Sequence, residues 1–329
     1  MAATVTAPVQ TAPEAADRFY ASGQHLIGSL ILDVRSLWRQ FDARNIDGSV
    51  LAITGQATAR IAAAQIGAAS QAQAYVSDVL DELDVDGGEP QATLRPAAFA
   101  VSASGLPLED TVATVRLRAL HAAAQGLSPS KAGLGLLERI AETQVTSAAR
   151  QATSTAMAVR PKVTGWVRML NPGACSRCIV LAGKFYRWNQ GFQRHPRCKC
   201  RHIPATEDVG GDYLTDPDAY FASLSADEQA HAFTAAGAQA IRDGADIGQV
   251  VNARLGIERT QMFGRSMQTT TVGTTARSTY GRAQRDLAKV QGERYRRTRT
   301  PRLLPESIYE IANDRQDAIR LLRFYGYTT

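Results

Sequence analysis

The sequence predicts a mainly α-helical protein with a small α+β module of the zinc-knuckle type. Apolar residues recur at helical spacing through most of residues 14–160 and again beyond residue 216, which indicates a helical N-terminal region and a helical C-terminal region. All four cysteines fall between residues 175 and 200, which predicts a Cys/His-stapled centre. Residues 259–302 are rich in Arg and Thr and poor in apolar side chains, so a basic extended segment is expected there.

The N-terminal region is expected to be built from long helices. Residues 1–13 are rich in Ala, Thr and Pro and are expected to form a mobile tail. Gly and Pro interrupt the helical pattern at 84–107, which is expected to be a connector. A Ser128-Pro129 start signal opens the last of these helices. The predicted helices cover residues 13–43, 46–83, 108–125 and 128–160.

The pattern changes after residue 160. Aromatic and β-branched residues predict short strands at 163–170 and 184–188, on either side of the turn residues Asn171-Pro172-Gly173. Ser225 and Glu228 have the spacing of a capping box, which predicts a helix start. Helices are predicted at 217–224, 225–243, 246–255 and 305–325.

These elements divide the chain into six predicted segments. They are a tail at 1–13, an acidic helical region with its connector at 14–107, a domain with the Cys/His module at 108–205, a helical extension at 206–258, the basic extended segment at 259–302, and a C-terminal helix at 303–329.

Charge is distributed unevenly along the 329 residues. Residues 1–110 hold 6 Arg, no Lys and 13 acids, a net charge of −7. Residues 160–205 hold 10 Lys and Arg and no acid, and residues 259–302 hold 11 against 2 acids. Both basic segments are therefore expected to bind anions.

The sequence favours a protein that is made and assembled in a cytoplasm. It contains no apolar stretch of about 18 residues that could span a membrane, and residues 1–13 lack the pattern of a signal peptide. Thiols stay reduced in a cytoplasm, so a tight cysteine cluster is more often a metal site than a set of disulfides there.

The cysteine spacing predicts a structural zinc site. Cys175 and Cys178 form one close pair, and Cys198 and Cys200 form a second pair beside His195. Two such pairs separated by a loop of roughly 15–20 residues can supply thiolates to one tetrahedral Zn²⁺. A shell of four thiolates and a shell of three thiolates with the His195 imidazole both remain open.

Two other interpretations of the cysteines are disulfide pairing and unrelated core cysteines. A zinc ion in a closed shell has no open coordination position, and no Glu stands beside His195 as a general base. The predicted metal is therefore structural rather than catalytic.

The same residues resemble the signature of a phage family. Cys175-Ser-Arg-Cys178, Leu181-Ala-Gly-Lys-Phe185 and His195-Pro-Arg-Cys-Lys-Cys200 are similar to the motif of the tailed-phage head-morphogenesis family, the Mu F-type minor head proteins. Lys199 replaces the usual Arg, and one residue between Lys184 and Phe185 is missing. The resemblance covers about 130–205, and the C-terminal sequence resembles versions from actinobacterial phages.

The resemblance implies a minor capsid protein of a tailed phage that acts in head assembly and in genome packaging or ejection. Its implied partners are the portal protein and the major capsid protein, and several copies per particle are expected. The implied location is the virion, in the head interior or at the portal vertex.

The basic segment is a candidate for sequence-independent contact with phage double-stranded DNA, because Arg residues there alternate with Gly, Thr and Tyr. An acidic protein surface and a solvated loop are the alternatives. The candidate contact residues are Arg277, Arg282, Arg285, Arg294, Arg296, Arg297 and Arg299.

Binding is favoured over catalysis. Some relatives are described as capsid maturation proteases, but the sequence has no Gly-x-Ser-x-Gly elbow, and its five His residues suggest no triad. A zinc-stabilised nuclease is disfavoured because residues 160–205 contain no acid. A zinc-stabilised nucleic-acid-binding protein is a further alternative.

Overall fold

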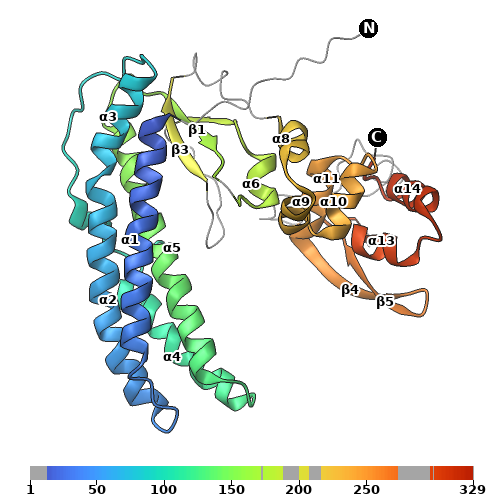
Figure 1. Ribbon diagram of the computed structural model, residues 1–329, viewed down its shortest axis with the longest axis horizontal. Helices are drawn as coiled ribbons and strands as arrows, with labels where there is room; N and C mark the ends of the chain where they lie inside the picture. Colours follow the sequence, from blue (N-terminus) through green and yellow to red (C-terminus); the bar gives the residue numbers. More distant parts are fainter. Residues whose placement is uncertain are drawn as a thin grey trace. The chain divides into compact units, whose positions relative to one another are not determined.

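The computed structural model describes residues 13–171, 173–187, 200–206, 216–272, 297–298 and 300–328, and it divides into two compact units (Figure 1). The first, called the bundle unit, comprises the described residues up to 171 together with 183–187 and 200–206. The second, the C-terminal unit, comprises 173–182 and the described residues from 216 onwards.

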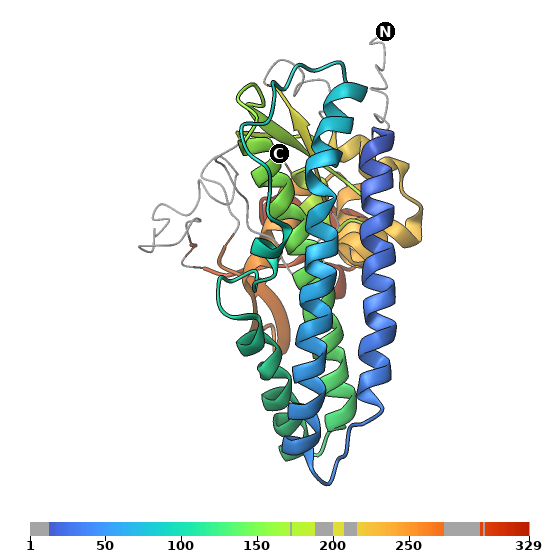
Figure 2. The same cartoon turned by 90° about the vertical axis from the view of Figure 1, so that its left-hand side faces the viewer.

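The bundle unit is built on long helices that lie side by side (Figure 2). Apolar residues from α1, α2, α4 and α5 form one continuous core along them, with Val34, Ile53, Val112 and Leu137 fully buried. The helices are α1 (Glu14–Trp38), α2 (Ile46–Ser70), α3 (Ala72–Glu82), the 3₁₀ turn η1 (Pro96–Phe99), α4 (Leu108–Ala124) and α5 (Pro129–Ala158). The prediction of a mainly helical chain is confirmed.

The predicted helix over 46–83 is wrong in one respect, because it is two helices that meet at Gln71. The hydroxyl of Ser70 and the side-chain amide Nε2 of Gln71 both donate to the carbonyl oxygen of Gly67, at 2.9 and 3.2 Å. Side chains that bond to a helix carbonyl compete with the backbone ladder, which accounts for the interruption.

A small antiparallel sheet completes the bundle unit. Its strands are β1 (Gly165–Met169), β2 (Phe185–Arg187) and β3 (Arg201–Ala205), in the order β2-β1-β3. Trp166 pairs with Tyr186 on one side and with Pro204 on the other. Trp166 and Ile203 are buried against α3 and α5 in a second apolar cluster. The sequence predicted the first two strands but not β3.

The C-terminal unit combines short helices with a second antiparallel sheet of order β4-β5-β6. Met267, Leu303, Ile308 and Leu322 lie in its core. Its elements are α6 (Ser176–Val180), α8 (Pro217–Ser223), α9 (Ala226–Phe233), α10 (Ala235–Arg242), α11 (Ile247–Ala253), η3 (Arg254–Gly256), β4 (Ile257–Met262), β5 (Arg265–Thr270), β6 (Arg302–Leu303), α13 (Pro305–Ile311) and α14 (Arg315–Phe324).

Two predicted helices of this unit are each split in two. The helix predicted over 225–243 begins with the expected capping box but breaks at Thr234, between α9 and α10. The helix predicted over 305–325 breaks before Asp314, whose side chain caps α14 by accepting from the Asp317 amide at 2.8 Å. In both places a side-chain oxygen satisfies the exposed amides of a new helix start.

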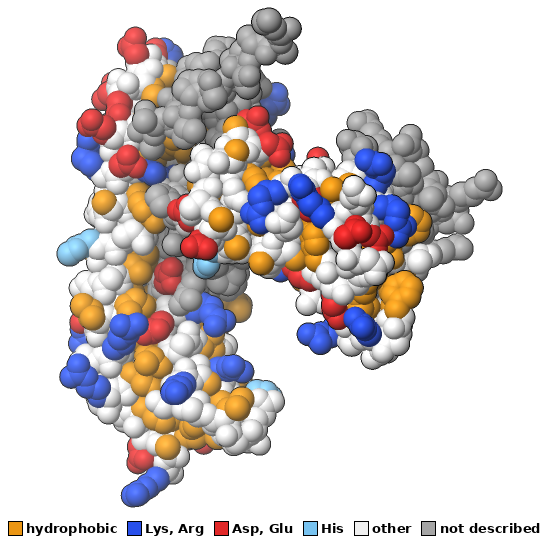
Figure 3. All heavy atoms as spheres, turned by 45° about the vertical axis from the view of Figure 1, so that its right-hand side comes forward, with side chains coloured by type: hydrophobic (Ala, Val, Ile, Leu, Met, Phe, Trp, Pro, Cys, Tyr) orange, Lys and Arg blue, Asp and Glu red, His pale blue; other side chains and the backbone are white. Residues whose placement is uncertain are grey.

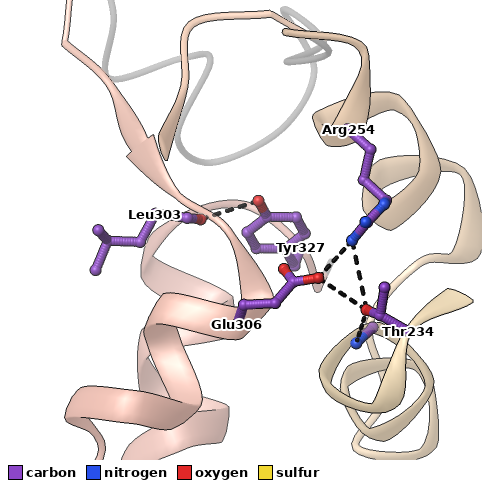
Figure 4. A network of polar contacts seen from close by, with 6 residues as sticks. Thr234, Arg254, Leu303, Glu306 and Tyr327 are labelled. Atoms are coloured by element: carbon purple, nitrogen blue, oxygen red, sulfur yellow. Dashed lines mark hydrogen bonds and ion pairs between the residues drawn. The ribbon is translucent and has the colours of Figure 1, made fainter. Parts of the chain in front are cut away.

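The break at Thr234 is held by a network of polar side chains (Figure 4). Thr234 has φ 68° and ψ 161°, a region that strains any residue with a Cβ. Its hydroxyl donates to Glu306 at 2.8 Å and accepts from the Gly237 amide at 3.2 Å, while Arg254 pairs with the same carboxylate. These contacts connect α9 and α10 to α13.

Asp243 ties α10 to α13 and α14. Its side chain is fully buried and accepts from the Tyr309 hydroxyl at 2.6 Å, from Arg315 at 2.8 Å and from Gln239 at 3.1 Å. Burial raises the pKa of this carboxyl, but the hydrogen bonds and the Arg315 charge outweigh burial and hold the pKa below its usual value.

Gly165 lies at a point of close approach between β1 and β2. A Cβ built on Gly165 would come within 2.1 Å of the Tyr186 carbonyl oxygen. Gly165→Ala is therefore expected to destabilise the bundle unit by roughly 1–3 kcal/mol, the usual cost of overpacking. Trp38 and Trp166 lie in the bundle unit, so tryptophan fluorescence during denaturant unfolding measures the effect.

Gly28 of α1 is the matched control. A Cβ there meets nothing within 4 Å, so Gly28→Ala is expected to stabilise the helix by about 0.5–1 kcal/mol. Equal effects of the two substitutions would contradict the close approach at Gly165.

Asp243→Asn is expected to destabilise the C-terminal unit by roughly 1.5–3 kcal/mol at pH 7, because it removes hydrogen bonds to a buried charge. Since folding lowers the pKa of Asp243, its contribution is present at neutral pH and is lost as the pH falls below about 4 toward the folded pKa. The difference between wild type and variant should therefore shrink at low pH.

The described part of the C-terminal unit contains no tryptophan, so its unfolding is followed by far-UV circular dichroism in the same denaturant series. Asp86→Asn is the control, since Asp86 and Lys162 form an exposed pair and should contribute close to nothing. A difference between wild type and Asp243→Asn that stays constant down to pH 3 would contradict the assignment.

Candidate functional site

The strand β1 organises the centre of the candidate site. Its Trp166 ring stacks on Tyr186 with centroids 4.5 Å apart and on His202 with centroids 3.9 Å apart. The hydroxyl of Tyr75, on α3, donates to the His202 carbonyl at 2.5 Å. These contacts fix β3, the strand that follows the cysteine motif, against β1 and the helices.

Arg168, on β1, contacts the last cysteine of the motif. Its side chain is almost fully buried, and its Nε donates to the sulfur of Cys200 at 3.2 Å. Arg150, on α5, donates to the Cys200 carbonyl at 2.9 Å. Two arginines from different elements therefore hold the last cysteine of the motif.

The first cysteine pair lies in the C-terminal unit, at the start of α6. Cys175 is the residue before the first helical turn, and Cys178 lies within it and is buried. Arg177, between them, donates to Asn252 of α11 at 2.9 Å. Cys200 belongs to the bundle unit.

The sulfur atoms of Cys175 and Cys178 are 3.4 Å apart. A disulfide bond would bring them to about 2.05 Å, so this pair is not bonded. Two thiolates on one tetrahedral Zn²⁺ would lie about 3.8 Å apart, given Zn–S bonds of about 2.3 Å. The pair is therefore close to the separation that a shared metal requires.

The other predicted ligands are only partly described. His195 and Cys198 lie outside the described residues, whereas Cys200 is described and immediately precedes β3. Within the described ranges, no group of three or more His, Cys, Asp and Glu side chains has the geometry of a metal site. The zinc site accordingly remains a prediction.

Most of the predicted anion-binding residues also lie outside the described residues. Arg297, in the basic segment 259–302, is described. It precedes Thr298, whose backbone amide donates to the Thr271 carbonyl at 2.7 Å. Thr298 thus lies beside Thr271, the residue that follows β5. The candidates outside the described residues are Arg277, Arg282, Arg285, Arg294, Arg296 and Arg299.

A cavity of about 90 Å³ lies within the bundle unit, between α1, α5 and the start of β3. Its walls include Tyr20, Tyr75 and Arg150, together with the predicted ligand Cys200 and its neighbour Arg201. Arg201 lies over the Tyr20 ring and pairs with Asp17 of α1. The described end of the cysteine motif is thereby tied to the helices.

Charges of both signs are distributed over the surface of the bundle unit (Figure 3). Several join neighbouring helices as ion pairs: Arg35 with Glu138, Arg60 with Asp33, and Arg116 with Asp47. Arg116, Lys162 and Arg201, which lie beyond residue 110, pair with Asp47, Asp86 and Asp17, so the negative net charge of residues 1–110 is partly balanced within the bundle unit.

Sequence reasoning missed Arg168 and Arg150 as residues that position the cysteine motif. Arg168 stands within the apolar run Trp166-Val-Arg-Met-Leu170. A charged residue in a strand that is otherwise apolar must find a polar partner if it is buried, so this position carried a usable signal. Arg150 stands in a helix among polar residues, so its sequence position gave no such signal.

No helix in the described part of the chain is long and apolar enough to cross a membrane. Comparison with curated proteins and with solved structures finds no match. A scan of family models matches residues 10–227 to the model described as VG15 protein, a family of viral proteins from phages.

The match covers more than half of the chain, including every described residue of the bundle unit and the helices α6 and α8. It ends at the start of α9, so most of the C-terminal unit lies beyond it. On this extent of similarity, the chain belongs to the VG15 protein family of phage proteins.

Proposed function

We propose that this chain is a minor capsid protein of a tailed phage that acts in head morphogenesis. In this role it binds the portal protein or the inner surface of the major capsid protein, and it takes part in genome packaging or ejection. The observation that carries the proposal is the VG15 match over residues 10–227, which includes the Cys/His motif of the Mu F-type resemblance.

The protein acts by binding rather than by catalysis. Its described buried charges serve structure: Asp243 joins three helices, and Arg168 holds Cys200. Neither group combines a nucleophile with an adjacent base. Its place is the virion, in the head interior or at the portal vertex, in several copies.

The helices α4 and α5, together with the cysteine module, are the proposed docking elements for the portal or the inner capsid. Leu106 and Leu127 flank α4 and are 58% and 57% exposed, and Leu117 on α4 itself is 62% exposed. Exposed apolar side chains mark a protein-binding surface where they form a contiguous patch, and these three leucines are the positions at which the proposed docking is tested. They belong to the part of the chain that the family match covers.

A structural Zn²⁺ is proposed to stabilise the cysteine module. It would be held by the four thiolates of Cys175, Cys178, Cys198 and Cys200, or by three of these thiolates and the His195 imidazole. The 3.4 Å separation of the first two sulfurs supports this assignment. Zinc in a closed shell supplies folding free energy and no activated water.

The basic segment at 259–302 is proposed to contact packaged DNA without reading its sequence. Eleven Lys and Arg against two acids favour phosphate binding through counterion release.

The proposed portal contact is tested by co-purification. The full-length chain should retain the portal protein of the same phage at moderate salt, and a variant with Leu117→Asp and Leu127→Asp should retain at least tenfold less, because buried charges oppose apolar docking. Leu32→Asp on α1, where Leu32 is 66% exposed, is the matched control and should bind normally. If the wild-type chain retains neither the portal nor the major capsid protein, the proposed role is wrong.

The metal proposal is tested by elemental analysis of the purified full-length chain. About one zinc per chain is expected, and Cys178→Ser and Cys198→Ser should each lower both the zinc content and the melting temperature. Substitution by Co²⁺ distinguishes the two candidate shells, because the thiolate charge-transfer band scales with the number of thiolates, and His195→Ala should change it only in the mixed shell. A metal-free protein that melts at the same temperature after cysteine substitution would refute the site.

A further inference from the structure

The β4–β5 hairpin presents a two-stranded ribbon with two different faces. On its inner face, Met267 is fully buried and Met262 packs against the same core. On its outer face, Arg259, Gln261 and Ser266 are exposed. Side chains alternate between the faces of a strand, and the pairing of Gln261 with Ser266 places these polar groups together.

The turn at the hairpin tip holds an exposed aromatic ring in a strained backbone position. Met262 pairs with Arg265, which leaves a two-residue turn. Its residues Phe263 and Gly264 have φ of 52° and 72°, as a type I′ turn requires. Asn, Asp or Gly would adopt the first position more readily, yet a Phe side chain stands there and is 69% exposed.

Two of the three exposed charges of the ribbon are positive, since Arg259 and Arg265 stand against Glu258. Arg259 and Arg265 are exposed, and neither forms an ion pair with another residue in the described part of the chain. The ribbon belongs to the segment 259–302, whose net charge is +9 (11 basic minus 2 acidic residues). A polyanion therefore fits this surface better than a basic or neutral partner does.

Duplex DNA matches the shape and the chemistry of this ribbon. Proteins that read DNA with β-strands place them in the major or the minor groove, where Arg and Gln side chains donate to base edges and phosphates. Proteins that bend DNA insert an apolar side chain, Phe among them, between base pairs in the minor groove. The ribbon has a comparable arrangement, because an exposed Phe stands at its tip and Arg259 and Arg265 lie behind it on opposite faces.

We propose that the β4–β5 hairpin lies in the minor groove of duplex DNA and inserts Phe263 between base pairs, with Arg259 and Arg265 on the phosphates. This inference rests on the DNA contact of the proposed function, to which it adds a binding element and a bend in the bound duplex. Binding of this kind depends on how easily DNA deforms and does not require a fixed sequence.

The experiment measures binding of the full-length chain to a 30-base-pair duplex labelled at both ends. Fluorescence anisotropy gives the affinity, and energy transfer between the two labels gives the bend. Phe263→Ala is expected to weaken binding about tenfold and to abolish the change in energy transfer, because the inserted ring is lost. Arg259→Ala and Arg265→Ala should each lower the slope of log K against log salt by about one, as expected for lost phosphate contacts.

Two control variants separate binding from folding. Phe324→Ala removes a ring that is 61% exposed on α14 of the same unit, and it should leave affinity and bend unchanged. Phe263→Asn relieves the backbone strain of the turn, so the variant should melt at or above the temperature of the wild type. The bend of the bound duplex should nevertheless be lost.

The possible outcomes distinguish this inference from the proposed function. If the wild-type chain binds the duplex and Phe263→Ala binds and bends it equally well, the ribbon inference is wrong and the DNA contact stands. If the wild-type chain shows no salt-dependent duplex binding, the ribbon inference and the proposed DNA contact are both wrong. If Phe263→Ala instead abolishes capture of the portal and leaves DNA binding unchanged, the ribbon contacts protein, which overturns the inference.

Discussion

The buried guanidinium of Arg168 is the constraint on which the centre of the bundle unit depends. A positive charge removed from water must be paired or hydrogen-bonded, and the sulfur of Cys200 is one acceptor that it contacts. This contact fixes the beginning of β3, and β3 in turn contacts α1, α3 and α5. A single strand position thus links the cysteine motif to the helices that give the unit its core.

Helical periodicity predicted most of the fold because the long helices bury one face each. What it could not predict were the breaks, since Thr234 lies in a helical pattern and its positive φ depends on Glu306 and Arg254, which are distant in sequence. The strand β3 was missed because it contains Pro204. Proline is tolerated there because β3 is an edge strand of its sheet.

The candidate site was predictable to the extent that it depends on local spacing. The cysteine pairs follow from sequence, as does the near approach of Cys175 and Cys178 within one helical turn. The partners of Cys200 come from β1 and α5, some 30 and 50 residues away in sequence, and no spacing rule predicts such contacts. The ribbon tip was not predicted either, because Phe-Gly is an unusual sequence for a type I′ turn.

The hydrogen bond between Thr298 and Thr271 has a mechanical consequence for Arg297, the residue before it. Five residues after Arg297, the backbone pairs with β5 through Arg302 and Leu303, and Leu303 is fully buried in the core of the C-terminal unit. A pull exerted on Arg297 by a bound anion would therefore pass through these backbone hydrogen bonds into the core of the unit.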